Sequence, residues 1–251
     1  MSWIHRLGRH VRFRVTHHSK FPKGDFIAFL YRLASRGFRP QHIIDVGANK
    51  GNWSRRIHAV FPECTFTMIE PQREMQPQLD ALCRKVPGSR WICAGAGAVR
   101  GQLALTVNPD TVSSSFTPSE TAAANQKFEH RLVPIVTLDD VVREEDGRIP
   151  DMVKIDAEGL EPDVLRGAQS LIGRTEVFLL QTYLFSPPAN WPTTVEVLKL
   201  MDELGYEIFD VVMLRRQFGE LALAKIAFVR RGGVLRPATA TGIERVPQRW
   251  P

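Results

Sequence analysis

The sequence is poor in cysteine and contains no long apolar run. Its three cysteines, Cys64, Cys83 and Cys93, form no CxxC or Cys/His pattern, so we expect reduced thiols and no cysteine-based metal site. No apolar stretch approaches the roughly 20 residues that a bilayer-spanning helix needs. The basic opening, "MSWIHRLGRHVRFRVTHHSKF", lacks the continuous apolar core of a signal peptide. Together these absences favour a cytoplasmic protein.

Acidic residues are scarce near the start of the chain. Residues 1–41 hold nine Lys and Arg against one acid, Asp25, whereas the whole chain has a net charge of +6. A basic arm over residues 1–24 is typical of a solvated terminus, and contact with an anionic membrane surface or a phosphorylated substrate stays open. Because no Asn/Asp-Pro-Pro-Tyr motif is found, we expect no sequence-specific nucleic-acid partner.

Strand patterns alternate with amphipathic helix patterns along most of the chain. The apolar spacing predicts helices over 25–38, 52–61, 74–86, 162–172 and 195–205, and strands over 42–46, 64–70, 90–96, 102–107, 151–157, 176–185, 206–214 and 223–231. This order predicts one α/β domain over residues 25–231, with a Rossmann-like, mostly parallel seven-stranded sheet and helices on both faces. Residues 232–251 are expected to form a tail, and the polar segment 108–130 a loop that covers the substrate.

The stretch "DVGANKG" lies where the first strand turns into a helix, which is where such sheets bind ligands. Gly47, Asn49 and Gly51 bring bare backbone and free N–H groups close to a ligand. The spacing fails the G-x-G-x-x-G template of dinucleotide sites, although a dehydrogenase that uses NAD remains the main competitor. Asp45 suits the ammonium and sulfonium of S-adenosylmethionine, and Glu70, at the end of the second strand, suits the two hydroxyls of a ribose.

A second acidic cluster follows a buried strand in "VKIDAEGLEPDVLRGAQSLI". Asp156 is expected at the same edge of the sheet as Asp45 and Glu70, with Glu158 in the following turn. Glu161 and Asp163 are the acids that a helix N-terminus favours. We therefore predict that Asp156 and Glu158 form the catalytic part of the site.

These motifs carry a resemblance to a known family. In order, "DVGANKGNW", "IEP", "AGAGAVRG", "VTLDD" and "VKIDAEGLEPDVLRGA" resemble the FkbM-type methyltransferases over residues 40–231. The resemblance implies a class I methyltransferase fold and S-adenosylmethionine-dependent O-methylation of a glycan, glycolipid or secondary metabolite. The family's acid after the third strand is replaced by Ala98, so the backbone near Ala96 is expected to contact the adenine. The chain also has Gln181 where Glu is common and Lys225 where Asp is usual.

Methyl transfer to a hydroxyl needs an aligned acceptor and a base. We predict that Asp156 or Glu158 is the base, or that Asp156 is one ligand of a Mg²⁺ ion, although the sequence suggests no second ligand. Trp191 could stack on a sugar or pack on the core. The histidines, His42 among them, show no ligand spacing and are expected at the surface. The alternative function is a non-catalytic S-adenosylmethionine-binding module of a polysaccharide assembly complex.

Overall fold

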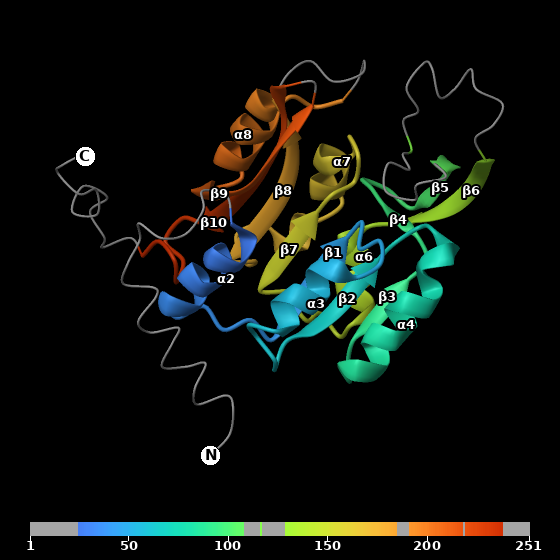
Figure 1. Ribbon diagram of the computed structural model, residues 1–251, viewed down its shortest axis with the longest axis horizontal. Helices are drawn as coiled ribbons and strands as arrows, with labels where there is room; N and C mark the ends of the chain where they lie inside the picture. Colours follow the sequence, from blue (N-terminus) through green and yellow to red (C-terminus); the bar gives the residue numbers. More distant parts are fainter. Residues whose placement is uncertain (1–24, 108–115, 117–128, 185–190, 218, 238–251) are drawn as a thin grey trace.

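The computed structural model describes residues 25–107, 116, 129–184, 191–217 and 219–237 (Figure 1). The basic arm at 1–24, most of the loop at 108–130 and the segment 185–190 before Trp191 lie outside these residues. A seven-stranded sheet has the order β3-β2-β1-β7-β8-β10-β9. Its strands are β1 His42–Val46, β2 Thr65–Ile69, β3 Arg90–Ile92, β7 Met152–Ile155, β8 Val177–Tyr183, β9 Tyr206–Gln217 and β10 Glu220–Arg230. The five strands from β3 to β8 run parallel, and β10 runs antiparallel to β8 and β9. The predicted mostly parallel seven-stranded sheet is confirmed.

Helices cover both faces of this sheet, as the alternating pattern predicts. The helices are α2 Phe26–Ser35, α3 Asn52–His58, α4 Gln76–Lys85, α6 Leu138–Glu144, α7 Glu161–Arg166 and α8 Thr194–Glu203. Successive strand residues point to opposite faces, so Ile43 of β1 packs with α2, α3 and α4, whereas Ile44 packs with α6, α7 and α8. Because β1 lies between two neighbours and two helical layers, all five of its residues are buried.

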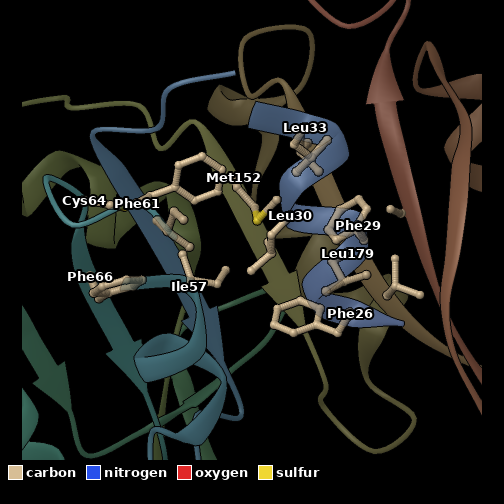
Figure 2. Close-up of a cluster of buried hydrophobic side chains, with 14 of the residues drawn as sticks. Phe26, Phe29, Leu30, Leu33, Ile57, Phe61, Cys64, Phe66, Met152 and Leu179 are labelled. Atoms are coloured by element: carbon tan, nitrogen blue, oxygen red, sulfur yellow. The ribbon is translucent and has the colours of Figure 1, made fainter. Parts of the chain in front are cut away.

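The core on the α2 side is rich in aromatic rings (Figure 2). Phe26, Phe29, Leu30 and Leu33 recur at helical spacing on α2, and all of them are buried against the sheet. The helix begins at Asp25, whose Oδ1 accepts hydrogen bonds from two backbone amides of the first turn. The expected helix and its cap are therefore both present.

The predicted strand over residues 90–96 is split in two. Its first part is β3, and its second, β4 Gly95–Ala96, leaves the main sheet and pairs with β6 Glu129–Val136. Together with β5 Gly101–Val107 these strands form a separate three-stranded sheet of order β4-β6-β5, which the sequence analysis does not anticipate. The first two residues of β6, Glu129 and His130, fall inside the segment expected to be a loop, since both are polar and exposed, as loop residues are.

Two further expectations differ from the structure. The helix expected over 162–172 ends at Arg166, and the 3-10 turn Gln169–Leu171 follows it. The break falls at Gly167, which packs closely on Gly97: a Cβ on Gly167 would be 2.1 Å from the Gly97 carbonyl oxygen. The expected tail also starts too early: Leu235 is buried, and its amide donates to Glu176 Oε1 at 2.9 Å.

No helix in the described part of the chain is long and apolar enough to cross a membrane.

Candidate active site

The turn after β1 touches the end of β7. Gly47, Asn49 and Gly51 all have positive φ, at 70°, 47° and 71°. A Cβ on Gly47 would lie 2.1 Å from the carbonyl oxygen of Asp156, so only glycine allows the two strand ends to come this close. The Asp156 amide also donates to the Val46 carbonyl at 3.2 Å. The two motifs of the sequence are therefore joined at the carboxyl edge of the sheet, as predicted.

Glu70 follows β2 and faces the same cavity as Gly47 and Asn49. Its Oε2 accepts from the Asn49 amide at 2.7 Å, and its Oε1 accepts from the Gln72 amide at 3.0 Å. Burial raises the pKa of Glu70 above its ordinary value, although these amide donors oppose the shift. A buried carboxylate fixed by backbone amides presents its remaining lone pairs in one direction, which suits a pair of vicinal hydroxyls.

Asp45 does not line the cavity, in contrast to the prediction that it binds the cofactor. It is fully buried beneath the turn, where Oδ2 accepts from the Ser54 hydroxyl at 2.7 Å and Oδ1 lies 3.0 Å from Lys154 Nζ. Gly51 also lies away from the cavity lining, since its Cα faces the side chains of Leu79 and Leu82. Asp45 and Gly51 therefore stabilise the turn on the side away from the cavity. The sequence places Asp45 at the correct strand end but does not reveal that Lys154 pairs with it.

A chain of alternating charges links Asp45 to the cavity. Lys154 Nζ lies 3.0 Å from Asp45 and 3.6 Å from Asp156, and it donates to the Gly47 carbonyl at 2.7 Å. Lys225 of β10 then donates to Asp156 Oδ2 at 2.5 Å. Burial raises the pKa of Asp156, but the ammonium groups of Lys225 and Lys154 outweigh it and hold that pKa below its ordinary value. Asp156 is therefore a fixed anion with two cationic neighbours, which makes it a weak proton acceptor.

Glu158 is in a different environment, although only one residue separates it from Asp156. Its Oε2 accepts from the Tyr183 hydroxyl at 2.7 Å, and its Oε1 accepts from Gln181 Nε2 at 3.3 Å. Burial and the nearby Asp156 carboxylate raise the pKa of Glu158, against the effect of these hydrogen bonds. Of the two predicted catalytic carboxylates, Glu158 thus has the higher proton affinity. Gln181, at the position where the family commonly has Glu, orients Glu158.

Glu161 supports this turn from below. It is fully buried and accepts hydrogen bonds from the amides of Ala157 and Gly159, each at 3.1 Å. Burial, with the added repulsion of Asp156 and Glu158, raises the pKa of Glu161 to about 8. The burial of Glu161 was not predictable from the sequence, because its spacing fits an ordinary acid of a helix N-terminus and does not show that the side chain turns inward.

Trp191 closes one side of the turn. Its ring lies edge-to-face against Tyr183, with centroids 4.8 Å apart, and it packs so closely on Gly159 that a Cβ there would be 2.9 Å away. Trp191 therefore packs on protein, and because it also lines the cavity, its stacking on a sugar stays a prediction.

A flat apolar slot lies beside Glu70. Ala94, Gly95 and Ala96 form one wall, Ile69 lies next to them, and the Phe116 ring covers Gly95, where a Cβ would be 2.5 Å from the ring. Ala96 thus lies on the cavity side, as the sequence analysis expects. An apolar slot next to a buried carboxylate fits a purine with its ribose, since the ring surface would be desolvated while the hydroxyls kept a hydrogen-bond partner.

The cavity has a volume of about 630 Å³, within the range of small-molecule sites. One half is the Glu70 half, built from the ends of β1 and β2 and from β4. The other half is formed by β8, β10 and β9 together with the Asp156–Glu158 turn. Its lining includes Gly47, Asn49, Glu70, Gln72, Ala94, Gly95, Ala96, Phe116, Asp156, Glu158, Gln181, Tyr183, Trp191, Met213, Arg215, Arg216, Gln217, Leu223 and Lys225. Asp156 and Glu158 therefore share one hollow with Glu70.

Several lining residues were missed by sequence reasoning. Met213, Arg215 and Gln217 alternate along β9, and the sequence prediction ends that strand at residue 214. The alternation of these residues along the strand could have indicated that they face the cavity, but it falls in a charged stretch that resembles a turn in sequence. For the metal hypothesis, the described residues contain no group of three His, Cys, Asp or Glu side chains that could hold a metal ion, and no second ligand for Asp156 can be named.

Comparison with known proteins assigns the chain to a family. Residues 45–208, more than half of the chain, match the family model described as the methyltransferase FkbM domain. Similar solved structures include magnesium protoporphyrin IX methyltransferase from Synechocystis with bound S-adenosylhomocysteine, at 9% identity and a TM-score of 0.47, covering 90% of this chain and 95% of that one. Fibrillarin from Aeropyrum pernix with bound S-adenosylmethionine has 16% identity and a TM-score of 0.46, covering 80% and 74%. No curated protein matches. The protein belongs to the FkbM family of methyltransferases.

Proposed function

We propose that the protein transfers a methyl group from S-adenosylmethionine to a hydroxyl of a glycan, glycolipid or secondary metabolite. Its family makes it a methyltransferase rather than a dehydrogenase. The observation that supports the proposal best is the pairing of two different carboxylates in one cavity. Glu70 lies beside an apolar slot, as an adenosine needs, and Glu158, with its raised pKa, lies in the other half of the cavity.

The residues that would hold the cofactor follow from the geometry. Glu70 would accept from the ribose hydroxyls, the Ala94–Ala96 backbone and Phe116 would enclose the adenine, and the turn at Gly47 and Asn49 would hold the methionine part, since all of these residues line the cavity. When bound, S-adenosylmethionine supplies an electrophilic methyl group on a sulfonium. The chain itself supplies alignment and exclusion of water, which together account for several kcal/mol of the barrier.

Glu158 is the proposed general base. The acceptor oxygen gains the methyl group as the methyl–sulfur bond of the donor breaks and S-adenosylhomocysteine leaves. The hydroxyl proton passes to Glu158, whose raised pKa makes it a better acceptor than Asp156. Asp156, held by Lys225 and Lys154, keeps the charge pattern of the site fixed and anchors the turn that carries Glu158. Tyr183 and Gln181 orient the base by hydrogen bonds.

The test is a binding measurement followed by a transfer assay. Calorimetric titration with S-adenosylmethionine should give binding that weakens about 10- to 100-fold in Glu70→Gln, because a carboxylate that binds two hydroxyls is lost. Glu63→Gln is the matched control, since Glu63 is exposed and lies two residues before the start of β2, away from the cavity. Absence of binding in the unmodified protein would refute the proposal.

The second step separates an enzyme from a non-catalytic module. The protein is incubated with methyl-labelled cofactor and an extract of glycans, glycolipids and small metabolites from its own organism. Label that appears in an alkali-stable methyl ether supports the proposal. Cofactor binding without any transfer would favour the non-catalytic alternative.

A further inference from the structure

The acceptor half of the cavity has a regular wall made by three antiparallel strands. Strand register places Lys225 between Gln181 and Met213, and Leu223 between Tyr183 and Arg215. Because alternate residues of a strand share a face, these six side chains form two adjacent rows on the cavity side. We call this surface the acceptor wall.

The two cations of the acceptor wall differ in their partners. Lys225 is neutralised by Asp156, at 2.5 Å. Arg215 makes no hydrogen bond or ion pair with any residue in the part of the chain that the structure describes, although it lines the cavity. Its neighbour Arg216 instead donates to the Gly219 carbonyl at 2.9 Å and is tied to the β9–β10 hairpin. Arg215 is therefore the cation of this wall that is available to a ligand.

The position of Arg215 relates it to the proposed base. Tyr183, which donates to Glu158, lies in the same row as Arg215 with Leu223 between them. Two strand spacings separate the two backbones, about 10 Å. Glu158, which Tyr183 contacts, and Arg215 line the same cavity. A molecule of the size of a sugar residue can therefore contact Glu158 at one end and Arg215 at the other.

We propose that the acceptor carries a carboxylate or phosphate group, which Arg215 binds while the hydroxyl to be methylated lies beside Glu158. The inference rests on the proposed function and specifies its substrate class. A guanidinium fits the planar or tetrahedral oxygens of such groups with two parallel hydrogen bonds. The anion also offsets the positive charge of Arg215, which is exposed and lines the cavity. Arg215 lies outside residues 45–208, so this feature is not part of the matched family segment.

The test compares three probes of similar size and different charge. Protein saturated with S-adenosylhomocysteine is titrated calorimetrically with glucose, glucuronate and glucose 1-phosphate. We expect at least one anionic probe to bind about 10-fold more tightly than glucose, because a charge-assisted pair is gained. Tighter binding of glucose 1-phosphate than of glucuronate identifies phosphate as the recognised group, and the reverse order identifies a carboxylate.

Variants separate a specific contact from general attraction to a basic protein. Arg215→Gln should abolish the preference for the anionic probe, and Arg215→Lys should keep part of it. Lys199→Gln is the matched control: Lys199 lies on α8, pairs with Glu203 and has a side chain 78% exposed, so its loss should leave the preference unchanged.

Equal affinity for all three probes, or a preference that survives in Arg215→Gln, would overturn this inference. Neither result would affect the proposed function, which fails instead if S-adenosylhomocysteine does not bind.

Discussion

The two acids of the "DAEG" turn show how one residue type takes on different chemistry. Asp156 contacts two ammonium groups, whereas Glu158 contacts a phenol and an amide. The ammonium groups stabilise the ionised form of Asp156 more than burial destabilises it, so its pKa is lowered. The phenol and the amide stabilise ionised Glu158 less than burial destabilises it, so its pKa is raised. The proposed roles of Asp156 as anchor and Glu158 as base follow from these partners and not from the motif itself.

Replacement of the base tests this division. Glu158→Gln keeps the size of the side chain but cannot accept the hydroxyl proton, so we expect the rate of methyl transfer to fall about 10²- to 10³-fold. Binding of S-adenosylmethionine should stay unchanged, because Glu158 lies in the acceptor half of the cavity. Asp163→Asn, a nearby acid that is paired with Arg166, is the control and should keep its rate. Full turnover in Glu158→Gln would remove Glu158 from the mechanism.

Glu161 gives a prediction about stability and pH. Its pKa is about 8 in the folded chain, against 4.5 for an ordinary glutamate, because it is fully buried. The unfolded chain releases this proton near pH 4.5 and the folded chain only near pH 8, so Glu161 lowers the free energy of unfolding as pH rises through this window. Glu161→Gln resembles the neutral acid, and its one carbonyl oxygen, at the position of Oε1, can accept from the Ala157 amide at 3.1 Å and the Gly159 amide at 3.4 Å.

The variant should therefore match the original protein at pH 4.5 and be more stable at pH 8, by about 1–3 kcal/mol. Urea unfolding at the two pH values measures both differences. A stability difference that is the same at pH 4.5 and pH 8 would show that Glu161 is ionised in the fold.

Where the secondary-structure elements meet, glycine decides the geometry of the site. Gly47→Ala adds a methyl group 2.1 Å from the Asp156 carbonyl oxygen at a residue with φ of 70°, so β1 and β7 must separate at the cavity edge. Gly37→Ala is a matched control, since its φ is 89° and no atom lies within 4 Å of the added Cβ. The control isolates the backbone cost of about 1–2 kcal/mol.

We expect Gly47→Ala to lose more stability than Gly37→Ala in thermal unfolding and to bind S-adenosylmethionine more weakly. Gly37→Ala should bind it normally. Equal losses of stability with normal binding in both variants would mean that the contact between the two strand ends is unimportant.

The elements themselves were largely predictable from the sequence. The helix at α2 and the strands β1 and β7 have strong periodicity and clear ends, such as the cap at Asp25. The three-stranded sheet was not predictable, because β4 has two residues and its partner β6 joins it only through tertiary contacts. Within the site, strand ends located Glu70 and Asp156, but the pairing of Lys154 with Asp45 depends on register between β1 and β7.

In the molecule as a whole, the cavity and a stabilising polar cluster lie at different edges of the main sheet. The cavity lies at the carboxyl edge, and a partly buried polar cluster centred on Glu145 joins strand residues away from it. Glu145 lies 3.0 Å from His42 Nε2 and 2.7 Å from Arg90 Nε, and it also accepts from the Thr67 hydroxyl. His42 is thus a buried member of the core and not the surface residue that the sequence analysis expects. One carboxylate connects α6 with the first three strands.

This cluster predicts how acid unfolds the protein. Burial raises the pKa of Glu145, but hydrogen bonds from His42, Thr67 and Arg90 outweigh it and lower the pKa to about 2. The stabilisation is complete above the unfolded value of 4.5 and is lost as pH falls toward 2. After allowance for solvent screening it amounts to about 1–2 kcal/mol.

Glu145→Gln should therefore destabilise the protein at pH 7 and show a shallower loss of stability between pH 4.5 and pH 2, while cofactor binding at pH 7 stays normal. Glu144→Gln is the adjacent control, because Glu144 is exposed and pairs with Arg100 on the surface. Chemical unfolding across this pH range measures the slopes. If Glu145→Gln and the original protein lose stability in parallel, other carboxylates control the acid transition and the cluster contributes only packing.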